Sequence, residues 1–296
     1  MAYNRSLGNL LDCGGQLVGL RNWCLVLEYD GGRYCGWQVQ PNAPSIQGEV
    51  EGVLSTILRE TVSLAVAGRT DTGVHALGQV ANFKTGAKFV PARLGWQVNA
   101  LLPNDIVIRE IKSVDDDFDA RRSARHRTYS YQILNRAFGS AFWRQHSWFV
   151  SKPLNISVAA EAARHLVGSH DFSAFTVAKE GPMIRRVTEL KIARGSGSEL
   201  VFSDETQTEG LISIRVTANA FLHHMVRLIV GTLVDVATGK LTPEQVRQIL
   251  ESKDVCQAGP RAPARGLRLE KVDYSISTSD DASKVEDIGS GVTAEL

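Results

Sequence analysis

The stretch VAGRTDTGVHALGQVANF, residues Val66–Phe83, places an Arg, an Asp, two Thr, three Gly and a His between two apolar segments. The β-prone residues on either side predict two strands that are joined through this polar loop. A plain hairpin turn needs one or two glycines and no charged pair near the core. The additional polar groups therefore indicate a functional site at the end of a strand.

The segments around this loop predict an alternation of strands and helices. The periodicity predicts strands at residues 22–31, 62–68, 77–85 and 105–114 and helices at residues 44–60 and 91–103. Along the chain their order is strand, helix, strand, strand, helix, strand. Ser45 is a suitable N-cap for the first helix, and prolines bracket the second. This order is that of a ferredoxin-like βαββαβ unit.

The second half of the chain repeats this style over a longer stretch. Its predicted strands cover residues 126–134, 187–195, 211–220 and 267–275, and its predicted helices cover 158–168, 221–239 and 242–251. The acidic stretch SVDDDFDA (Ser113–Ala120) marks a boundary. We therefore expect an α+β protein with a leader (1–20) and tail (276–296) that are disordered, and with domains 21–118 and 119–275 that enclose a cleft.

The composition limits the possible partners and compartments. The 296 residues include 33 Lys and Arg against 32 Asp and Glu, so a polyanion would have to be held by a local basic patch. The four Cys form no C-x-x-C pair, which predicts free thiols in a reducing compartment. No apolar run reaches the length of about 20 residues that crosses a bilayer. We expect a cytoplasmic protein, although the leader leaves an organelle open.

Asp71 is the first candidate for chemistry. A carboxylate buried at a strand end needs a cation or several donors to remain charged. Arg69 is close in sequence, and Arg227 lies within the apolar stretch FLHHMVRLIVG, where a cation usually has a carboxylate partner. A bidentate pair between Arg227 and Asp71 across the cleft would satisfy both charges. The alternative is that Asp71 only caps its own turn.

A basic cluster occupies ARRSARHRTYSY, residues Ala120–Tyr131. Arg121, Arg125 and Arg127 interleave with aromatic residues, and this pattern suits phosphates and an unstacked base. The alternative is a solvated charged strand at a sheet edge.

The histidines do not predict a metal site. His75 has an alternative as a loop residue bonded to backbone. His223 and His224 are adjacent within a predicted helix, so we expect them to point to different sides and not to share a metal with His75.

Several blocks of this sequence resemble those of a known protein family. AGRTDTGVHALGQVANF, FDARRSARHRTYSYQI and ANAFLHHMVRLIVG resemble the three signature blocks of the TruA-type tRNA pseudouridine synthases, in the same order and at similar spacing. The entry segment YDGGRYCGWQVQPNAPSIQGEVEGVL and the exit segment ARGLRLEKVDY fit as well. The resemblance covers roughly residues 22–274. Arg122 departs from it, because the family often has an aromatic residue at that position.

The resemblance implies an isomerase that converts uridine to pseudouridine at positions 38 to 40 of the tRNA anticodon stem-loop. It implies no cofactor, no metal, a homodimer, and a pseudouridine synthase fold of two ferredoxin-like halves that form a continuous sheet with a central cleft. It assigns Asp71 as the catalytic aspartate, Arg227 as its partner, Tyr129 as the stacking residue and Arg69 as the residue that helps to extrude the base. Further substrate-binding residues would be Arg121, Arg125, Arg127, His75, Gly266 and Leu267.

The reaction suits these residue types. The glycosidic bond breaks and uracil rejoins through C5, so a carboxylate is needed beside the sugar and base, as a nucleophile at C1′ or C6 or as a base for the 2′ proton. A tRNA-binding or chaperone protein of the same fold without activity is the alternative. A hydrolase built on Asp71 and His75 would lack a Ser or Cys nucleophile or a metal site.

Overall fold

The computed structural model describes residues 19–178, 180–195 and 210–274. The strands in these ranges are β1 (Arg21–Tyr29), β2 (Ala65–Val66), β3 (His75–Thr85), β4 (Ile106–Val114), β5 (Ala124–Asn135), β6 (Trp148–Val150), β7 (Gly168–Asp171), β8 (Ile184–Arg194), β9 (Leu211–Ala218) and β10 (Leu267–Tyr274). The α-helices are α1 (Ile46–Leu58), α2 (Pro91–Leu101), α3 (Ile156–Arg164), α5 (Met225–Ala237) and α6 (Pro243–Ser252).

The N-terminal half forms a four-stranded antiparallel sheet. Its strands follow the order β4-β1-β3-β2, which together with α1 and α2 is the arrangement of a ferredoxin-like unit. Ser45 caps α1 by accepting a hydrogen bond from the Gly48 N–H at 3.2 Å, and Pro91 is the first residue of α2. The predicted order of strands and helices is confirmed here.

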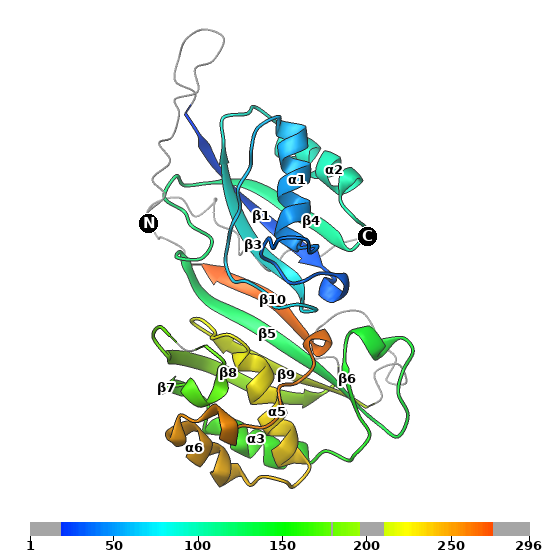
Figure 1. Cartoon of the computed structure of the whole chain (residues 1–296), viewed down its shortest axis with the longest axis vertical. Coiled ribbons are helices and arrows are strands. Elements are labelled where there is room, and N and C mark those ends of the chain that lie inside the picture. Colours follow the sequence, from blue (N-terminus) through cyan, green and yellow to red (C-terminus); the bar gives the residue numbers. More distant parts are fainter. Residues whose placement is uncertain (1–18, 179, 196–209, 275–296) are drawn as a thin grey trace, which may run out of the picture.

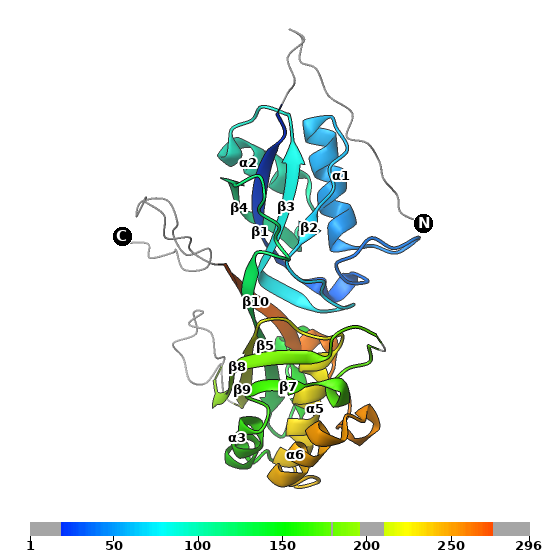
Figure 2. The same cartoon turned by 90° about the vertical axis from the view of Figure 1, so that its left-hand side faces the viewer.

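The C-terminal half repeats this arrangement as β10-β5-β9-β8, with β7 added at the outer edge and β6 paired with β5. The two halves join through a short parallel pairing of β3 with β10, at His75 opposite Arg268 and Ala76 opposite Leu269. In Figure 1, α1 and α2 lie in the upper half, α3, α5 and α6 lie in the lower half, and β5 and β10 cross between them. Figure 2 shows the same two lobes from the side. The predicted α+β fold with a continuous sheet is confirmed.

Helix α5 is buried along nearly its whole length. It begins at Met225, four residues later than the predicted start at Phe221, because His224 has a left-handed backbone (φ 64°) that does not continue a helix. At Gly231 the segment that follows α6 passes so close that an added Cβ would lie 1.6 Å from the Pro260 carbonyl oxygen. A glycine is therefore required at this position, and it fixes residues 259–262 against α5.

Three other predictions concern the chain as a whole. Within the described ranges, no helix combines the length and apolar character needed to cross a bilayer. The described cysteines, Cys24, Cys35 and Cys256, are free thiols, as predicted. The predicted tail, most of the predicted leader and most of the polar turn between β8 and β9 lie outside the described residues.

Candidate active site

The loop between β2 and β3 carries Asp71 and is clamped by the segment that follows β1. The Trp37 N–H donates to the Thr70 carbonyl at 3.0 Å, and the Gly73 N–H donates to the Tyr34 carbonyl at 3.3 Å. Gly36 has φ +91°, and a Cβ there would lie 2.7 Å from the Thr70 oxygen. Glycine is required for this close approach. The Asp71 side chain is held by this loop and is 23% exposed.

Arg227 reaches Asp71 from α5 in the other half of the molecule. Its Nη1 lies 3.5 Å from Asp71 Oδ2, and its Nε donates to the Ala262 carbonyl at 2.7 Å. Burial lowers the pKa of Arg227, whereas the nearby Asp71 raises it. Since an arginine has an ordinary pKa far above 7, the guanidinium remains charged. The predicted proximity is found, but the contact runs through one nitrogen and is not bidentate.

Two histidines also face Asp71, and here the sequence-based expectation was wrong. His223 Nε2 lies 3.6 Å from Oδ1 and His224 Nε2 lies 3.4 Å from Oδ2, while the two rings are 3.9 Å apart. Helical geometry does not separate these rings, because both residues precede the first residue of α5. The donor atoms of His223, His224 and Asp71 lie within 4.8 Å of one another, and His75 is not part of this group.

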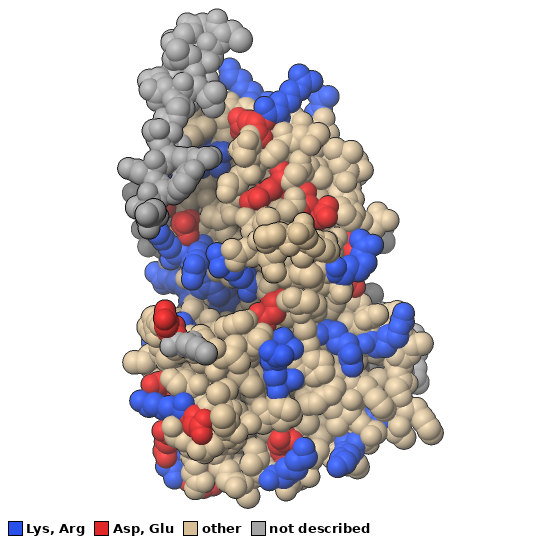
Figure 3. Space-filling view, in the orientation of Figure 1, with Lys and Arg blue, Asp and Glu red and all other residues tan. Residues whose placement is uncertain are grey.

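The cleft around Asp71 has a volume of about 1160 Å³ and is lined from both halves of the chain. This volume lies above the range of roughly 300–1,000 Å³ of small-molecule pockets, so it offers room for a nucleotide and its backbone. Seven of the predicted site residues line it: Arg69, Asp71, Arg121, Arg127, Tyr129, Arg227 and Leu267. Arg122, Arg185 and Arg261 add further cations to the lining. Figure 3 shows basic side chains gathered at the waist of the molecule, over the loop before β5.

Tyr129 forms an aromatic wall of the cleft. Its side chain is buried, and its ring packs edge-on against Phe221 with 5.1 Å between centroids. Burial raises the pKa of Tyr129 above its ordinary value, and the neighbouring Tyr29 and Asp71 act in the same direction. The phenol is therefore neutral at physiological pH and presents an uncharged aromatic surface.

Arg127 also lines the cleft, but its guanidinium is engaged with backbone carbonyls. Nε and Nη2 donate to Ala67 at 3.0 and 2.8 Å, Nη2 also donates to Arg121 at 2.7 Å, and Nη1 donates to Asn219 at 2.7 Å. Burial lowers its pKa from the ordinary arginine value. These contacts tie the Asp71 loop to β5 and to the chain after β9, which is a structural task. Substrate binding by Arg127 stays a prediction.

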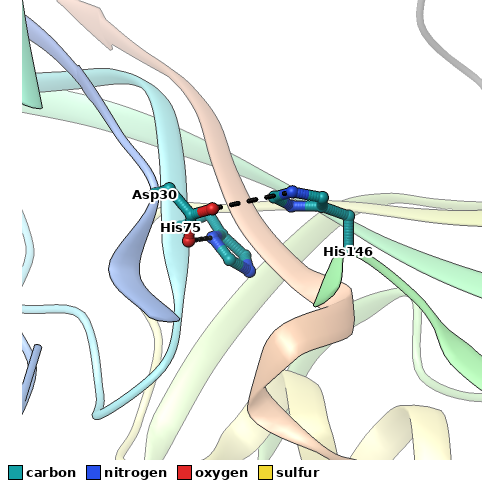
Figure 4. Close-up of side chains that lie close together, drawn as sticks. All are labelled: Asp30, His75 and His146. Atoms are coloured by element: carbon teal, nitrogen blue, oxygen red, sulfur yellow. Dashed lines mark ion pairs between the residues drawn. The ribbon is translucent and has the colours of Figure 1, made fainter. Parts of the chain in front are cut away.

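Three predicted residues lie away from the cleft lining. Arg125 is exposed at the start of β5. Gly266 is buried, and a Cβ there would lie 2.6 Å from the Tyr131 ring. His75 belongs to a separate cluster, in which the Asp30 carboxylate faces both His75 and His146 (Figure 4). The distance is 2.9 Å from His75 Nδ1 to Asp30 Oδ1 and 3.6 Å from His146 Nε2 to Asp30 Oδ2. Their binding roles stay predictions.

The donor atoms of Asp30, His75 and His146 lie within 4.8 Å of one another, as a metal site requires. However, His75 Nδ1 already accepts a hydrogen bond from the Gly31 N–H at 3.1 Å, and Nε2 lies 3.2 Å from the Arg265 carbonyl. The ring is therefore partnered within the protein on both sides. This cluster connects the loop after β1, the start of β3 and the segment before β6.

Comparison with known proteins places these features in a family. Residues 162–275 match the family model described as tRNA pseudouridine synthase. The chain is 44% identical over 257 residues to "tRNA pseudouridine synthase A" of Thermoanaerobacter sp. (strain X514), which covers 86% of this chain and 100% of the relative. It is 41% identical over 258 residues to "tRNA pseudouridine synthase A 2" of Bacillus anthracis, with coverage of 86% and 100%. It is 42% identical over 252 residues to "tRNA pseudouridine synthase A" of Moorella thermoacetica, with coverage of 84% and 98%.

The fold is thus that of a pseudouridine synthase. The chain belongs to the tRNA pseudouridine synthase A family, as the resemblance of its signature blocks predicted.

Proposed function

We propose that this protein isomerises uridine to pseudouridine in the anticodon stem-loop of tRNA, at positions 38 to 40. The observation that carries the proposal is the Asp71 carboxylate, which faces Arg227 at 3.5 Å in a cleft lined by arginines and by Tyr129. Relatives named tRNA pseudouridine synthase A over most of the chain support the reaction class.

The assigned roles follow from where each side chain lies. Asp71 supplies the carboxylate that acts on the sugar or base, and the Arg227 guanidinium faces it at 3.5 Å as its cationic partner. Extrusion of the target nucleotide costs a few kcal/mol, which the Tyr129 ring and an inserted Arg69 side chain partly offset. Arg69 suits this task because its side chain is exposed at the cleft. The arginines at positions 121, 122 and 185 bind phosphates near the cleft entrance.

The reaction can be followed through the hydrogen on C5 of uracil. Formation of the new bond at C5 displaces this hydrogen, so tRNA that carries [5-³H]uridine releases tritium into water. We expect Asp71→Asn to abolish release, by at least about 10³-fold, because an amide is neither a nucleophile nor a base at this site. Its affinity for tRNA should remain close to that of the unmodified protein.

The exposed Asp117→Asn variant is the matched control and should retain full activity. Substrates with cytidine at position 38, 39 or 40 identify which positions react. Tritium release by the Asp71→Asn variant at the normal rate would refute the proposed role of Asp71.

We further propose a homodimer in the cytoplasm, with each chain divided into domains 21–118 and 119–275. The acidic segment between β4 and β5 supports this boundary, because β4 ends at Val114 and β5 begins at Ala124. Light scattering of the purified protein measures the oligomeric state, and a mass of 32.3 kDa at micromolar concentration would contradict the dimer.

A further inference from the structure

His224 has an unusual place at the entrance to α5. It is the residue just before the helix and has a left-handed backbone, with φ 64° and ψ 5°. Its carbonyl accepts a hydrogen bond from the Leu228 N–H at 3.0 Å, and its side chain is only 12% exposed. This conformation is uncommon for residues other than Gly, although Asn, Asp and His adopt it more often than the rest. The ring is therefore held in a direction that an ordinary helical residue would not have.

Arg261 determines which nitrogen of the His224 ring carries the hydrogen. The Nη1 of Arg261 lies 3.0 Å from His224 Nδ1. Since a guanidinium can only donate, Nδ1 must accept, and a neutral ring then carries its hydrogen on Nε2. Nε2 is the atom that faces Asp71 Oδ2 at 3.4 Å. Burial lowers the pKa of His224 to about 4, opposed by Asp71 and assisted by His223, Arg261 and Arg227, so the ring is neutral at pH 7.

The segment that supplies Arg261 is itself fixed against α5. The Gly259 N–H donates to Thr232 Oγ1 at 2.9 Å, and the Ala262 N–H donates to the Arg227 carbonyl at 3.1 Å. The Ala262 carbonyl in turn accepts from Arg227 Nε at 2.7 Å. Residues 259–262 therefore position both groups that face Asp71 Oδ2, the Arg227 guanidinium directly and the His224 ring through Arg261.

The two oxygens of Asp71 have different surroundings as a result. Oδ2 faces Arg227 Nη1 at 3.5 Å and His224 Nε2 at 3.4 Å, and both side chains are nearly buried. Oδ1 faces His223 Nε2 at 3.6 Å, and the His223 side chain is 56% exposed. Distances of this length commonly shorten when substrate closes a site. The less restricted oxygen is Oδ1.

We infer that His224 is a positioning residue, locked by Arg261 as a neutral donor, that anchors Asp71 Oδ2 and leaves Oδ1 to meet the extruded uridine. The inference rests on the proposed role of Asp71. A neutral donor orients the carboxylate without adding a second full positive charge beside it, so the oxygen that reacts stays more nucleophilic or more basic than it would next to two cations.

Two substitutions of His224 separate its two nitrogens. The amide nitrogen of Gln can occupy the position of Nε2 and still donate to Asp71. Asn is shorter, so it can meet Arg261 but not Asp71, and it suits a left-handed backbone better than His does. We expect His224→Asn to lower kcat by about 10²-fold, the scale of one lost catalytic donor, with little change in KM or melting temperature. His224→Gln should restore kcat to within a few-fold of the unsubstituted enzyme.

The Arg261→Met variant tests the lock on the ring. Loss of the Arg261 guanidinium removes one of the cations that lower the pKa of His224, so this pKa rises. The His224 ring then becomes protonated at pH values where it is neutral in the unsubstituted enzyme. We expect a further decline of kcat on the acidic side, with a midpoint above the pKa of about 4 that His224 has beside Arg261. The double variant His224→Asn/Arg261→Met should lack this additional decline, because the titrating ring is gone. A purely structural role would lower kcat equally at all pH values.

The controls distinguish failure of this inference from failure of the proposed function. His170→Gln, on β7 at the far edge of the sheet, should leave all parameters unchanged. Full activity in His224→Asn, or no rescue in His224→Gln, would overturn the inference if Asp71→Asn is inactive. Activity in Asp71→Asn would instead overturn the proposed function. Rescue by Gln together with the additional acidic decline in Arg261→Met supports the positioning role.

Discussion

The contacts of Arg127 lead to a prediction that distinguishes a role of this residue in the stability of the fold from a role in substrate binding. Replacement by Met removes four hydrogen bonds to the carbonyls of Ala67, Arg121 and Asn219. A bond from a charged donor contributes about 1.5–3 kcal/mol, and each buried carbonyl left without a donor costs about 1–3 kcal/mol. Met retains much of the apolar part of the arginine side chain, and water can reach the part-buried carbonyls of Arg121 and Asn219, so both effects reduce the loss. We therefore expect Arg127→Met to lower the free energy of unfolding by about 3–5 kcal/mol.

This loss is measurable as a shift of the melting temperature. A change of 1 kcal/mol moves the melting temperature of a fold of this size by about 2–4 °C, so the loss of 3–5 kcal/mol should lower it by roughly 6–20 °C. Lys can replace one of the bonds and should recover about 1–2 kcal/mol. Arg125→Met, two residues earlier on the same strand and exposed, is the matched control and should melt within about 1 °C of the unsubstituted protein.

Binding of tRNA provides the opposing measurement. If Arg127 serves the fold alone, the slope of log affinity against log salt concentration stays unchanged at temperatures well below melting. A phosphate contact would instead reduce this slope by about 0.7–0.9. A purely structural role of Arg127 is refuted if Arg127→Met melts within 2 °C of the unsubstituted protein and binds tRNA about tenfold more weakly with a reduced salt slope.

Three further predictions follow from the cleft and its surroundings. Tyr129→Phe should keep most activity because the aromatic ring remains. Tyr129→Leu should lower kcat/KM by about 10- to 100-fold, because it loses base stacking worth about 1–3 kcal/mol. Equal kcat/KM values for the two variants in steady-state kinetics would contradict this prediction. Arg122→Ala should reduce the salt slope of tRNA binding by about 0.7–0.9 without lowering the melting temperature, and an unchanged slope in filter binding would exclude a phosphate contact. Burial lowers the pKa of His75 below its ordinary value of 6.5, so the unfolded chain binds a proton before the folded protein does. Stability should therefore fall as the pH drops below about 6.5, and His75→Asn should flatten this dependence in melting curves recorded from pH 8 to 5.

The sequence by itself determined the elements and their class. Apolar periodicity is a local property, so the helices and the longer strands of both halves could be predicted from neighbouring residues, whereas the short strands β6 and β7 were not predicted. The same holds for the helix cap at Ser45, which accepts a hydrogen bond from an N–H three residues later. The signature blocks around Asp71, Tyr129 and Arg227 identified the family.

The tertiary structure alone decided which of these residues meet and what their polar atoms do. Arg127 bonds to carbonyls 60 and 92 residues away, and Arg261 bonds to His224 across 37 residues. Such contacts depend on sheet register and on the packing of one segment against a helix, which no local pattern encodes. The prediction that His223 and His224 point apart failed for the same reason, because the left-handed backbone of His224 delays the start of α5. The residue types alone predicted a reactive carboxylate at Asp71, whereas the difference between the surroundings of its two oxygens follows from the fold.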